Sequence, residues 1–195
     1  FQITGSLKVL GSITGSLSGT ASFSTTASYV NPLNQQVIIN GSIVQGVTST
    51  ATGLNSYAAG FYTVATGEYS RAEGVSTIAS GNASHAEGSQ GTAAGTFSHA
   101  EGNFTQANGT YSHAEGNNAY ALGVASHAEG NYTIAKGDYQ HVQGQYNISS
   151  SAPAAFIIGN GTDITIRSNL VFASGSEFQI TGSLKATAGI TGSLF

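Results

Sequence analysis

The sequence predicts an all-β fold whose centre is a parallel β-roll built of 14-residue coils. Three regularities in the chain predict it. Glycine recurs every seven residues, fifteen times from Gly46 to Gly144. Alanine lies two residues before each of these glycines from Gly53 onward, except before the last, where Val142 replaces it. Histidine recurs only every fourteen residues, so the full repeat is fourteen residues long.

The seven-residue period does not predict a coiled coil. A heptad needs large apolar residues at two positions, whereas this repeat supplies alanine, serine or threonine, and glycine. Each glycine costs a helix about 1 kcal/mol relative to alanine. A strand of about five residues followed by a corner instead gives half a coil. We expect the corners at fourteen glycines: Gly53, Gly60, Gly67, Gly74, Gly81, Gly88, Gly95, Gly102, Gly109, Gly116, Gly123, Gly130, Gly137 and Gly144.

Side-chain alternation along a strand divides the positions of the repeat into two sets. The residues two and four before each glycine, alanine and serine or threonine, point into the coil. The residues one, three and five before it point outward. Such small interior side chains bury little apolar area, while ordering the backbone costs about 1–2 kcal/mol per residue. We therefore expect the roll to bury an outer face against other copies of the chain.

The roll is expected over residues 47–144, which hold seven coils. Residues 145–177 follow as a β connector or collar. Pro153 ends the regular spacing there, and "AAFIIG" and "DITIRSNLVFAS" are expected to be strands around the turn "NGTD". Arg167 lies in the second of these segments, where we expect it to cap carbonyls or to pair across an interface.

Short β-repeats flank the central segments. Residues 1–46 are expected to form a shaft or neck that ends in a hairpin, because an Asn-Gly pair separates two apolar runs. Residues 178–195 are expected to form a second shaft, similar to residues 1–17 at thirteen of seventeen positions. Because the chain begins at Phe1 rather than methionine, we expect it to be a piece of a longer fibre.

The pentapeptide "SHAEG" occurs four times, and its serine, histidine and glutamate suggest a hydrolase triad. Successive residues of a strand face opposite sides, so Ser84 points into the coil while His85 points outward. A nucleophile and its base need a hydrogen bond of about 2.6–3.2 Å, which this arrangement does not permit. We therefore expect no enzyme activity.

Stacking of the coils instead predicts columns of like residues on the outside of the roll. The histidine column is His85, His99, His113, His127 and His141; the glutamate column is Glu73, Glu87, Glu101, Glu115 and Glu129; the aromatic column is Tyr69, Phe97, Tyr111 and Tyr139. Carboxylates stacked about 4.8 Å apart repel one another unless neighbours compensate. Our hypothesis is that this face packs against neighbouring chains, with histidine and glutamate pairing between subunits.

Two alternatives remain open for these columns. One is a solvated ladder of charges. The other is a column of metal ions, since histidine is a common metal ligand. The spacing matches no known chelating pattern, and an alanine separates each histidine from its glutamate in the chain. We therefore expect no metal and no cofactor.

Charge and composition narrow the classes of function. Lysine and arginine together number five and the net charge is −4, whereas nucleic-acid binding needs a basic patch. We expect no nucleic-acid partner and, because no run of about 18 apolar residues is present, no membrane insertion. Cysteine is absent, so the chain has neither disulfides nor a thiol nucleophile.

The stretch "SHAEGNFTQANGTYSHAEGNNAYALGVASHAEG" resembles the head repeats of trimeric autotransporter adhesins, in which a "SVAIG"-type motif recurs with the same period. The resemblance implies a left-handed parallel β-roll in a homotrimer, with three chains side by side. Histidine and glutamate stand here where the adhesins often carry valine and isoleucine. The apolar contacts between adhesin chains are therefore not implied for this chain.

In the residues of the motif itself, the "SHAEG" repeats are more similar to those of phage tail-fibre and virion-fibre proteins. The segments "GDYQHVQGQYNI" and "IIGNGTDITIRSN" are similar to the part that follows such repeats in phage fibres. This resemblance implies a rigid structural segment of a virion fibre that supports host attachment, with other virion or fibre proteins as partners. The alternatives are the head of a bacterial trimeric adhesin at the cell surface, and a glycan- or receptor-binding module that uses the aromatic column.

Overall fold

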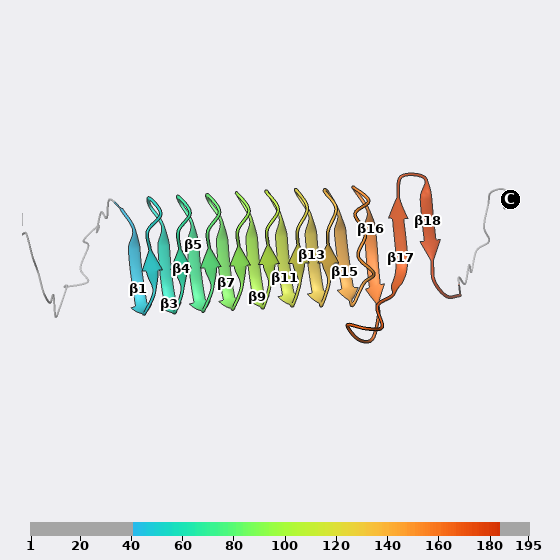
Figure 1. Cartoon of the computed structure of the whole chain (residues 1–195), viewed down its shortest axis with the longest axis horizontal. Coiled ribbons are helices and arrows are strands. Elements are labelled where there is room, and N and C mark those ends of the chain that lie inside the picture. The colour runs from blue at the N-terminus through green and yellow to red at the C-terminus, as the bar shows by residue number, and fades with distance from the viewer. Residues whose placement is uncertain (1–40, 184–195) are drawn as a thin grey trace, which may run out of the picture. The chain divides into compact units, whose positions relative to one another are not determined.

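The computed structural model of the chain describes residues 41–183, and every regular element in this range is a β-strand (Figure 1). The strands form two sheets, one of eleven strands and one of seven. Within the same range, no helix is long and apolar enough to cross a membrane. The all-β fold expected from the repeats is confirmed.

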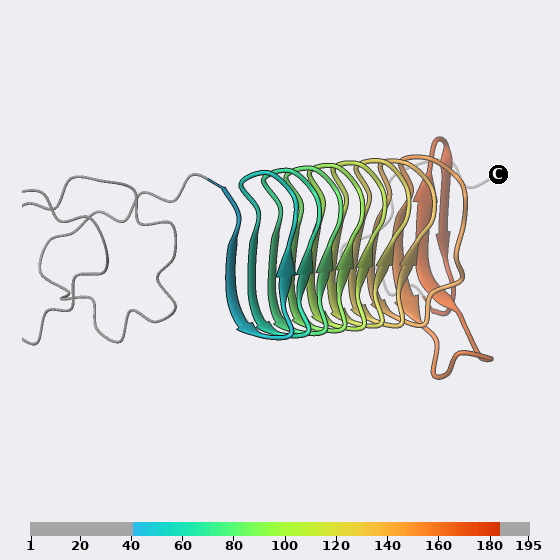
Figure 2. The same cartoon turned by 60° about the vertical axis from the view of Figure 1, so that its left-hand side comes forward.

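Each regular coil contributes one strand to each sheet. A five-residue strand lies in the larger sheet and a two-residue strand lies in the smaller sheet. Pairing between coils is parallel, and the aligned residues are 14 positions apart, as His99 and His113 are. Figure 2 shows the coils stacked into one continuous roll. This is the predicted parallel β-roll of 14-residue coils.

The strands of the regular coils alternate between the two sheets in chain order. The long strands are β1 (Ile43–Val47), β3 (Tyr57–Phe61), β5 (Arg71–Val75), β7 (His85–Ser89), β9 (His99–Asn103), β11 (His113–Asn117), β13 (His127–Asn131) and β15 (His141–Gln145). The short strands are β2 (Thr50–Ala51), β4 (Val64–Ala65), β6 (Ile78–Ala79), β8 (Thr92–Ala93), β10 (Gln106–Ala107), β12 (Tyr120–Ala121) and β14 (Ile134–Ala135).

The roll extends beyond its predicted range at both ends. It begins with β1 at Ile43, and one further long strand, β16 (Phe156–Asn160), pairs in parallel with β15. Aligned positions His141 and Phe156 are fifteen residues apart, so the last coil is one residue longer than the others. The seven-residue glycine spacing ends at Gly144, which is why the repeat did not reveal this last coil.

Small side chains fill the interior of the roll, as predicted. Ala100 and Ala107, each two residues before a glycine, are fully buried, and so are their equivalents in neighbouring coils. Ser98 is also buried, and its hydroxyl donates a hydrogen bond to the carbonyl of Gly95 at 2.7 Å. Ser70, Ser84 and Ser126 make the same hydrogen bond to a glycine carbonyl of the turn that they pack against.

Half of the fourteen glycines assigned to corners lie elsewhere. Gly60, Gly74, Gly88, Gly102, Gly116, Gly130 and Gly144 lie inside long strands, and only the other seven lie in turns. Both sets are glycine because the next coil is too close for a side chain. A Cβ on Gly102 would lie 2.2 Å from the carbonyl oxygen of Gly116, and one on Gly109 would lie 1.8 Å from that of Gly123.

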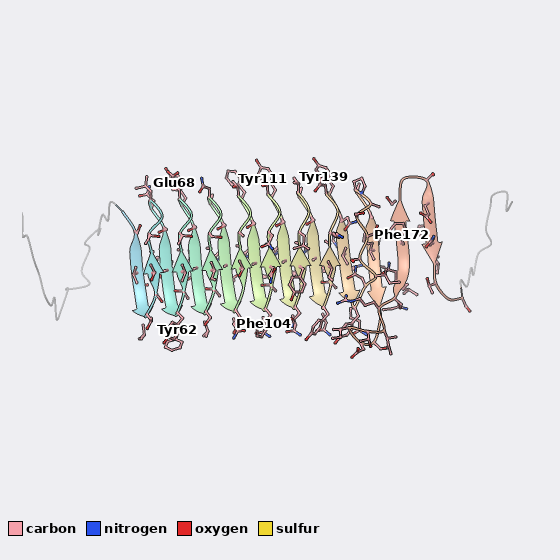
Figure 3. All side chains as sticks on the ribbon, viewed as in Figure 1. Tyr62, Glu68, Phe104, Tyr111, Tyr139 and Phe172 are labelled. Carbon is pink, nitrogen blue, oxygen red and sulfur yellow. The ribbon has the colours of Figure 1, made fainter. Side chains whose placement is uncertain are left out.

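Left-handed backbone at the corners is adopted by residues other than glycine. Phe97, Phe104 and Tyr111 have φ between 55° and 60°, a conformation that costs an L-residue roughly 1–2 kcal/mol. Hydrogen bonds between coils offset this cost, since the N–H of Tyr111 donates to the carbonyl of Thr96 at 2.9 Å. Figure 3 shows Tyr111 and Tyr139 at one end of the coils, and Tyr62 and Phe104 at the other.

An antiparallel hairpin continues the larger sheet past the roll. Strand β17 (Asn169–Ser174) pairs with β16, and β18 (Glu177–Ile180) pairs with β17. Residues 162–166 form bends, so the expected strand over "DITIR" is wrong, whereas the strand over "NLVFAS" is confirmed. The guanidinium of Arg167 donates to the carbonyls of Tyr132 at 2.9 Å and Asn147 at 3.1 Å. Arg167 thus caps carbonyls at the end of the roll.

The predictions for the flanking shafts fall mostly outside the described residues. Residues 43–47 pair in parallel with β3, not with an antiparallel neighbour on that side, and the other strand of the predicted hairpin precedes residue 41. Residues 178–180 belong to β18, so the predicted second shaft begins inside the hairpin. The remainder of that shaft, from residue 184, and the first shaft before residue 41 are not described.

Candidate functional site on the outer face of the long strands

The outer face of the long strands carries two adjacent columns of polar side chains. Strands β7, β9, β11 and β13 each begin with histidine and carry glutamate two residues later, so both side chains point to the same side. Parallel pairing aligns histidine with histidine and glutamate with glutamate in successive coils. We call the ten side chains the His–Glu ladder: His85, His99, His113, His127, His141, Glu73, Glu87, Glu101, Glu115 and Glu129.

The imidazole rings of the ladder are stacked. The ring centroids of His85, His99, His113 and His127 are 4.8 Å apart from one ring to the next, and neighbouring planes are within 12° of parallel. His141 lies 4.7 Å from His127, but its plane is turned by 65°. Stacking half-buries each ring against its neighbours, and it leaves the edges of the rings beside the glutamates.

His99 and His127 each lie between carboxylates of two coils. His99 Nε2 is 3.4 Å from Glu87 Oε1 and 3.8 Å from Glu101 Oε2. His127 lies in the same way between its two glutamates, at 3.8 and 3.9 Å. These distances exceed the usual hydrogen-bond range of about 2.7–3.2 Å. The Nε2 atoms of His99, His113 and His127 are inaccessible to solvent and have no hydrogen-bond partner in the described part of the chain.

Burial shifts the protonation of the ladder's central histidine. It lowers the pKa of His113, and the neighbouring imidazoles of His127 and His99 lower it further, against the attraction of Glu115 and Glu101. The neutral imidazole, with a free nitrogen lone pair, is therefore favoured at the middle of the stack.

Arginine stands where the first coil of the ladder would carry histidine. Arg71 on β5 donates from Nη2 to Glu73 Oε1 at 2.9 Å, and its guanidinium lies 5.1 Å from the centre of the Tyr57 ring. The hydrogen bond from Arg71 holds the pKa of Glu73 below its ordinary value, with partial burial opposing the shift. Glu73 thus has a permanently charged partner, whereas the other glutamates of the ladder have only histidines as partners that can carry a positive charge.

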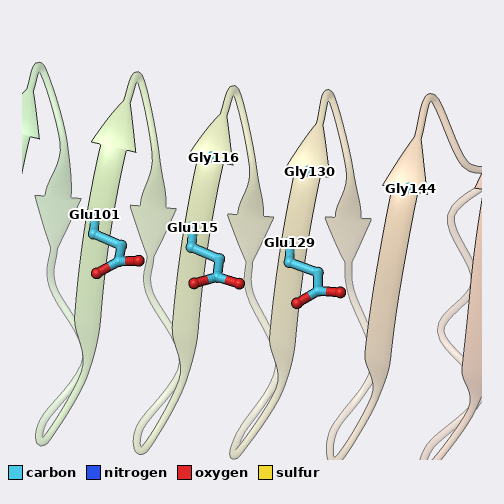
Figure 4. A pocket seen from close by; sticks show the side chains of 6 residues that line it. All are labelled: Glu101, Glu115, Gly116, Glu129, Gly130 and Gly144. Carbon is cyan, nitrogen blue, oxygen red and sulfur yellow. The ribbon is translucent and has the colours of Figure 1, made fainter.

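An open groove of about 420 Å³ runs beside the glutamates. Figure 4 shows its carboxylates on successive long strands. The side chains of Glu101, Glu115 and Glu129 are between 32% and 39% exposed, so the carboxylates are accessible from outside. The lining residues are Glu101, Glu115, Glu129, Gly116, Gly130 and Gly144.

The predicted aromatic column lies away from the ladder. Each long strand begins at the histidine, so the residue two positions earlier belongs to the corner and not to the strand. Phe97 and Tyr111 stack with their centroids 5.3 Å apart, and alanine interrupts the column at positions 83 and 125. The four aromatic side chains are between 55% and 64% exposed: Tyr69, Phe97, Tyr111 and Tyr139.

The serine and histidine of "SHAEG" do not meet. Ser84 is buried, and its hydroxyl donates to the carbonyl of Gly81 at 2.7 Å, whereas His85 lies on the outer face. Ala86 between His85 and Glu87 is also buried. This alanine therefore does not separate the imidazole from the carboxylate, contrary to the argument made from the chain order.

The sequence reasoning missed a third polar column at the end of the long strands. Asn103 Nδ2 donates to Asn117 Oδ1 at 2.9 Å, and Asn117 Nδ2 donates to Asn131 Oδ1 at 2.8 Å. The 14-residue spacing of these asparagines was the available signal. These hydrogen bonds between asparagine side chains link neighbouring coils, next to the glutamates of the His–Glu ladder.

Comparison with known proteins supports the adhesin-like architecture. The family model described as the YadA head domain repeat matches residues 51–70, 72–98 and 114–138, in two copies. All three segments lie within the roll, and the repeat is that of the β-roll of trimeric autotransporter adhesins. No entry among the curated proteins matches the chain. The expected similarity to adhesin heads is confirmed, and the similarity to phage fibres stays a prediction.

Proposed function

We propose that this chain is a rigid segment of an extracellular homotrimeric fibre, which acts as a structural spacer between the fibre's anchor and the parts that attach to a host. The observation that carries the proposal is the unbroken parallel register of nine long strands, from β1 to β16, in the larger sheet. Backbone hydrogen bonds between successive strands then run the full length of the roll, and this continuous hydrogen bonding resists bending.

The thin interior supports assembly into a trimer. The buried apolar side chains of the roll are alanines, apart from Val142 and Ile157. Burial of a side chain stabilises by about 25 cal/mol per Å² of apolar area, so alanine contributes little. The similarity to adhesin head repeats, whose rolls form homotrimers, points to three copies. The ladder face is our candidate for the contact, with each imidazole facing carboxylates of its own chain and of a neighbour.

Two settings fit a fibre of this kind. The phage setting, a tail fibre or related appendage of the virion, is our first choice because the "SHAEG" spelling and the flanking segments are similar to phage fibres. The head of a bacterial surface adhesin is the second, and the family match supports it equally. The exposed aromatic corners favour attachment to glycans less, because Phe97 and Tyr111 cover each other's ring faces.

Light scattering of the full chain in solution tests the trimer. We expect the mass of three chains, and a stable monomer would contradict the proposal. Glu115→Arg, which reverses a charge at the centre of the ladder, is expected to dissociate the trimer. Gln106→Arg, on the outer side of short strand β10, is the matched control and is expected to leave it intact. A trimer that tolerates both changes would place the ladder in solvent.

A further inference from the structure

We propose that the His–Glu ladder is a binding site for divalent transition-metal ions of the zinc type, with two ions per chain, each held by two histidines and one glutamate. The inference goes beyond the structural role proposed above. It uses only contacts within one chain.

The ladder contains four overlapping sets of potential ligands. In each set, one nitrogen from each histidine and one carboxylate oxygen lie within 4.8 Å of one another. Two imidazoles with one carboxylate form a ligand set that zinc accepts, with a fourth position left for water. The sets are His85 with Glu87 and His99, His99 with Glu101 and His113, His113 with Glu115 and His127, and His127 with Glu129 and His141.

The distances in the ladder suit a shared ion better than direct hydrogen bonds. His99 Nε2 is 3.4 Å from Glu87 Oε1 and 3.8 Å from Glu101 Oε2. Zinc lies about 2.0–2.2 Å from nitrogen and oxygen ligands. Two such ligands at a tetrahedral angle are therefore roughly 3.4 Å apart, which is close to these separations.

The unsatisfied nitrogen atoms are an independent observation in favour of a ligand. Nε2 of His99, His113 and His127 has no hydrogen-bond partner in the described range, and its accessible surface is below 1 Å². A buried polar atom without a partner is costly and calls for a missing water or ion. The lone pair of a neutral imidazole nitrogen is itself a metal ligand, and the accessible carboxylates beside it provide an entry path.

Binding requires a small rearrangement of the rings. Two imidazoles on one ion cannot stay parallel at 4.8 Å, so they must tilt toward each other. The side chains are free to do so, because about a third of each is exposed. The pair His127 and His141 already departs from parallel by 65°.

Sharing of histidines limits the number of ions. Each Nε2 binds one ion, and neighbouring sets have one histidine in common, so two neighbouring sets cannot both be filled. Five histidines therefore hold two ions at most. Without His99, the two remaining sets share His127, and only one ion fits. Without His113, the first and the last set remain, and two ions still fit.

His99→Asn and His113→Asn are therefore a matched pair of variants, because only the first lowers the number of ions that the ladder can hold. The full chain, freed of metal with a chelator, is titrated with zinc chloride at pH 7.5 by calorimetry, and bound zinc is counted by equilibrium dialysis. We expect two ions for the natural chain, one for His99→Asn and two for His113→Asn. Binding should be lost at pH 5, because protonated imidazoles are not ligands.

Absence of zinc binding, or equal stoichiometry in the two variants, would overturn the proposal, and more than two ions per chain would overturn the paired histidines. Both substitutions occupy equivalent places in neighbouring coils, and circular dichroism verifies that both variants fold. Light scattering on the same samples reports assembly separately, so failure of the metal site and failure of the trimer are distinguishable.

Discussion

Two columns of glycine mark the places where neighbouring coils touch. At Gly102, φ is 106° and the carbonyl oxygen of Gly116 occupies the space that a Cβ would need. Both the backbone conformation and the contact therefore exclude a side chain. Gly91 is different, because it lies at an inward position where most other coils carry serine or threonine, and the nearest atom to its Cβ would be Thr105 Oγ1 at 3.1 Å.

Gly102→Ala is expected to lower the free energy of unfolding by about 3 kcal/mol or more, since backbone strain and a clash with backbone add up. Gly91→Ala, the control, is expected to change it by no more than about 1 kcal/mol, because a side-chain hydroxyl can move aside. Chemical denaturation of both variants measures the difference. Equal effects would contradict the steric role assigned to the glycine columns.

Two of the three buried hydroxyls that have no hydrogen-bond partner in the described part of the chain are explained by departures from the repeat. Thr63 Oγ1 donates to Ser49 Oγ, one coil earlier, at 2.8 Å. Thr105 and Thr133 find no hydroxyl there, because the residues fourteen positions earlier are Gly91 and Ala119. At Gly91 and Ala119, the loss of a hydroxyl from the repeat thus leaves the buried hydroxyl of the next coil without a hydrogen-bond partner.

At the scale of the strand, the repeat predicted the coil but not its division. Two equal half-coils were expected, whereas the strands are five and two residues long. The left-handed residues of the corners were not predicted because they share no side-chain type, as Phe104 and Ala125 show. Hydrogen bonds to the neighbouring coil hold that conformation, so the cause is not local in sequence.

Side-chain alternation holds only inside a strand. It therefore predicted the His–Glu ladder correctly but not the position of the aromatic corner residues. Histidine and glutamate lie two residues apart inside one strand, where alternation places both outward. Tyr111 is also two residues from His113, but the strand begins at His113 and alternation ends there. The 14-residue period predicts which residues form columns. Which columns share a face depends on where each strand begins and ends, and the period does not show this.

The pairing of Arg71 with Glu73 at the start of the ladder makes stability depend on pH. The pKa of Glu73 is lowered in the folded chain, so the pairing stabilises fully above the unfolded value of about 4.5 and is lost as the pH falls through the folded value. Since both side chains are partly exposed, we expect about 0.5 kcal/mol. Denaturation at pH 6 and pH 3 should show that Arg71→Gln removes this part of the acid sensitivity. An unchanged difference between the two pH values would contradict the pairing.

At the scale of the whole roll, each coil is a module that contacts its two neighbours. Strand β9 pairs with β7 and β11 through the same positions, so removal of one coil would bring His85 opposite His113 without a change of register. The interior, the glycine columns and the ladder would all remain continuous. A change of half a coil would instead place a long strand opposite a short one.

Deletion of residues 99–112 is therefore expected to leave a folded roll, with a midpoint of thermal unfolding within about 5 °C of the natural chain. Deletion of residues 99–105 is the control and is expected to prevent cooperative folding, because it removes the long strand β9 and brings the short strand β10 opposite the long strand β7. Circular dichroism during heating measures both. A 14-residue deletion that unfolds the chain would refute the modular description.

The direction of the hydrogen bonds also sets how the roll yields to mechanical load. Bonds between coils lie along the long axis, and the described chain enters at β1 and leaves beyond β16 (Figure 1). Tension between these ends pulls the coils apart in the direction of their bonds, so they separate one after another. Each released coil of fourteen residues lengthens the chain by roughly 45 Å, so a roll that is stiff against bending is expected to extend stepwise under tension.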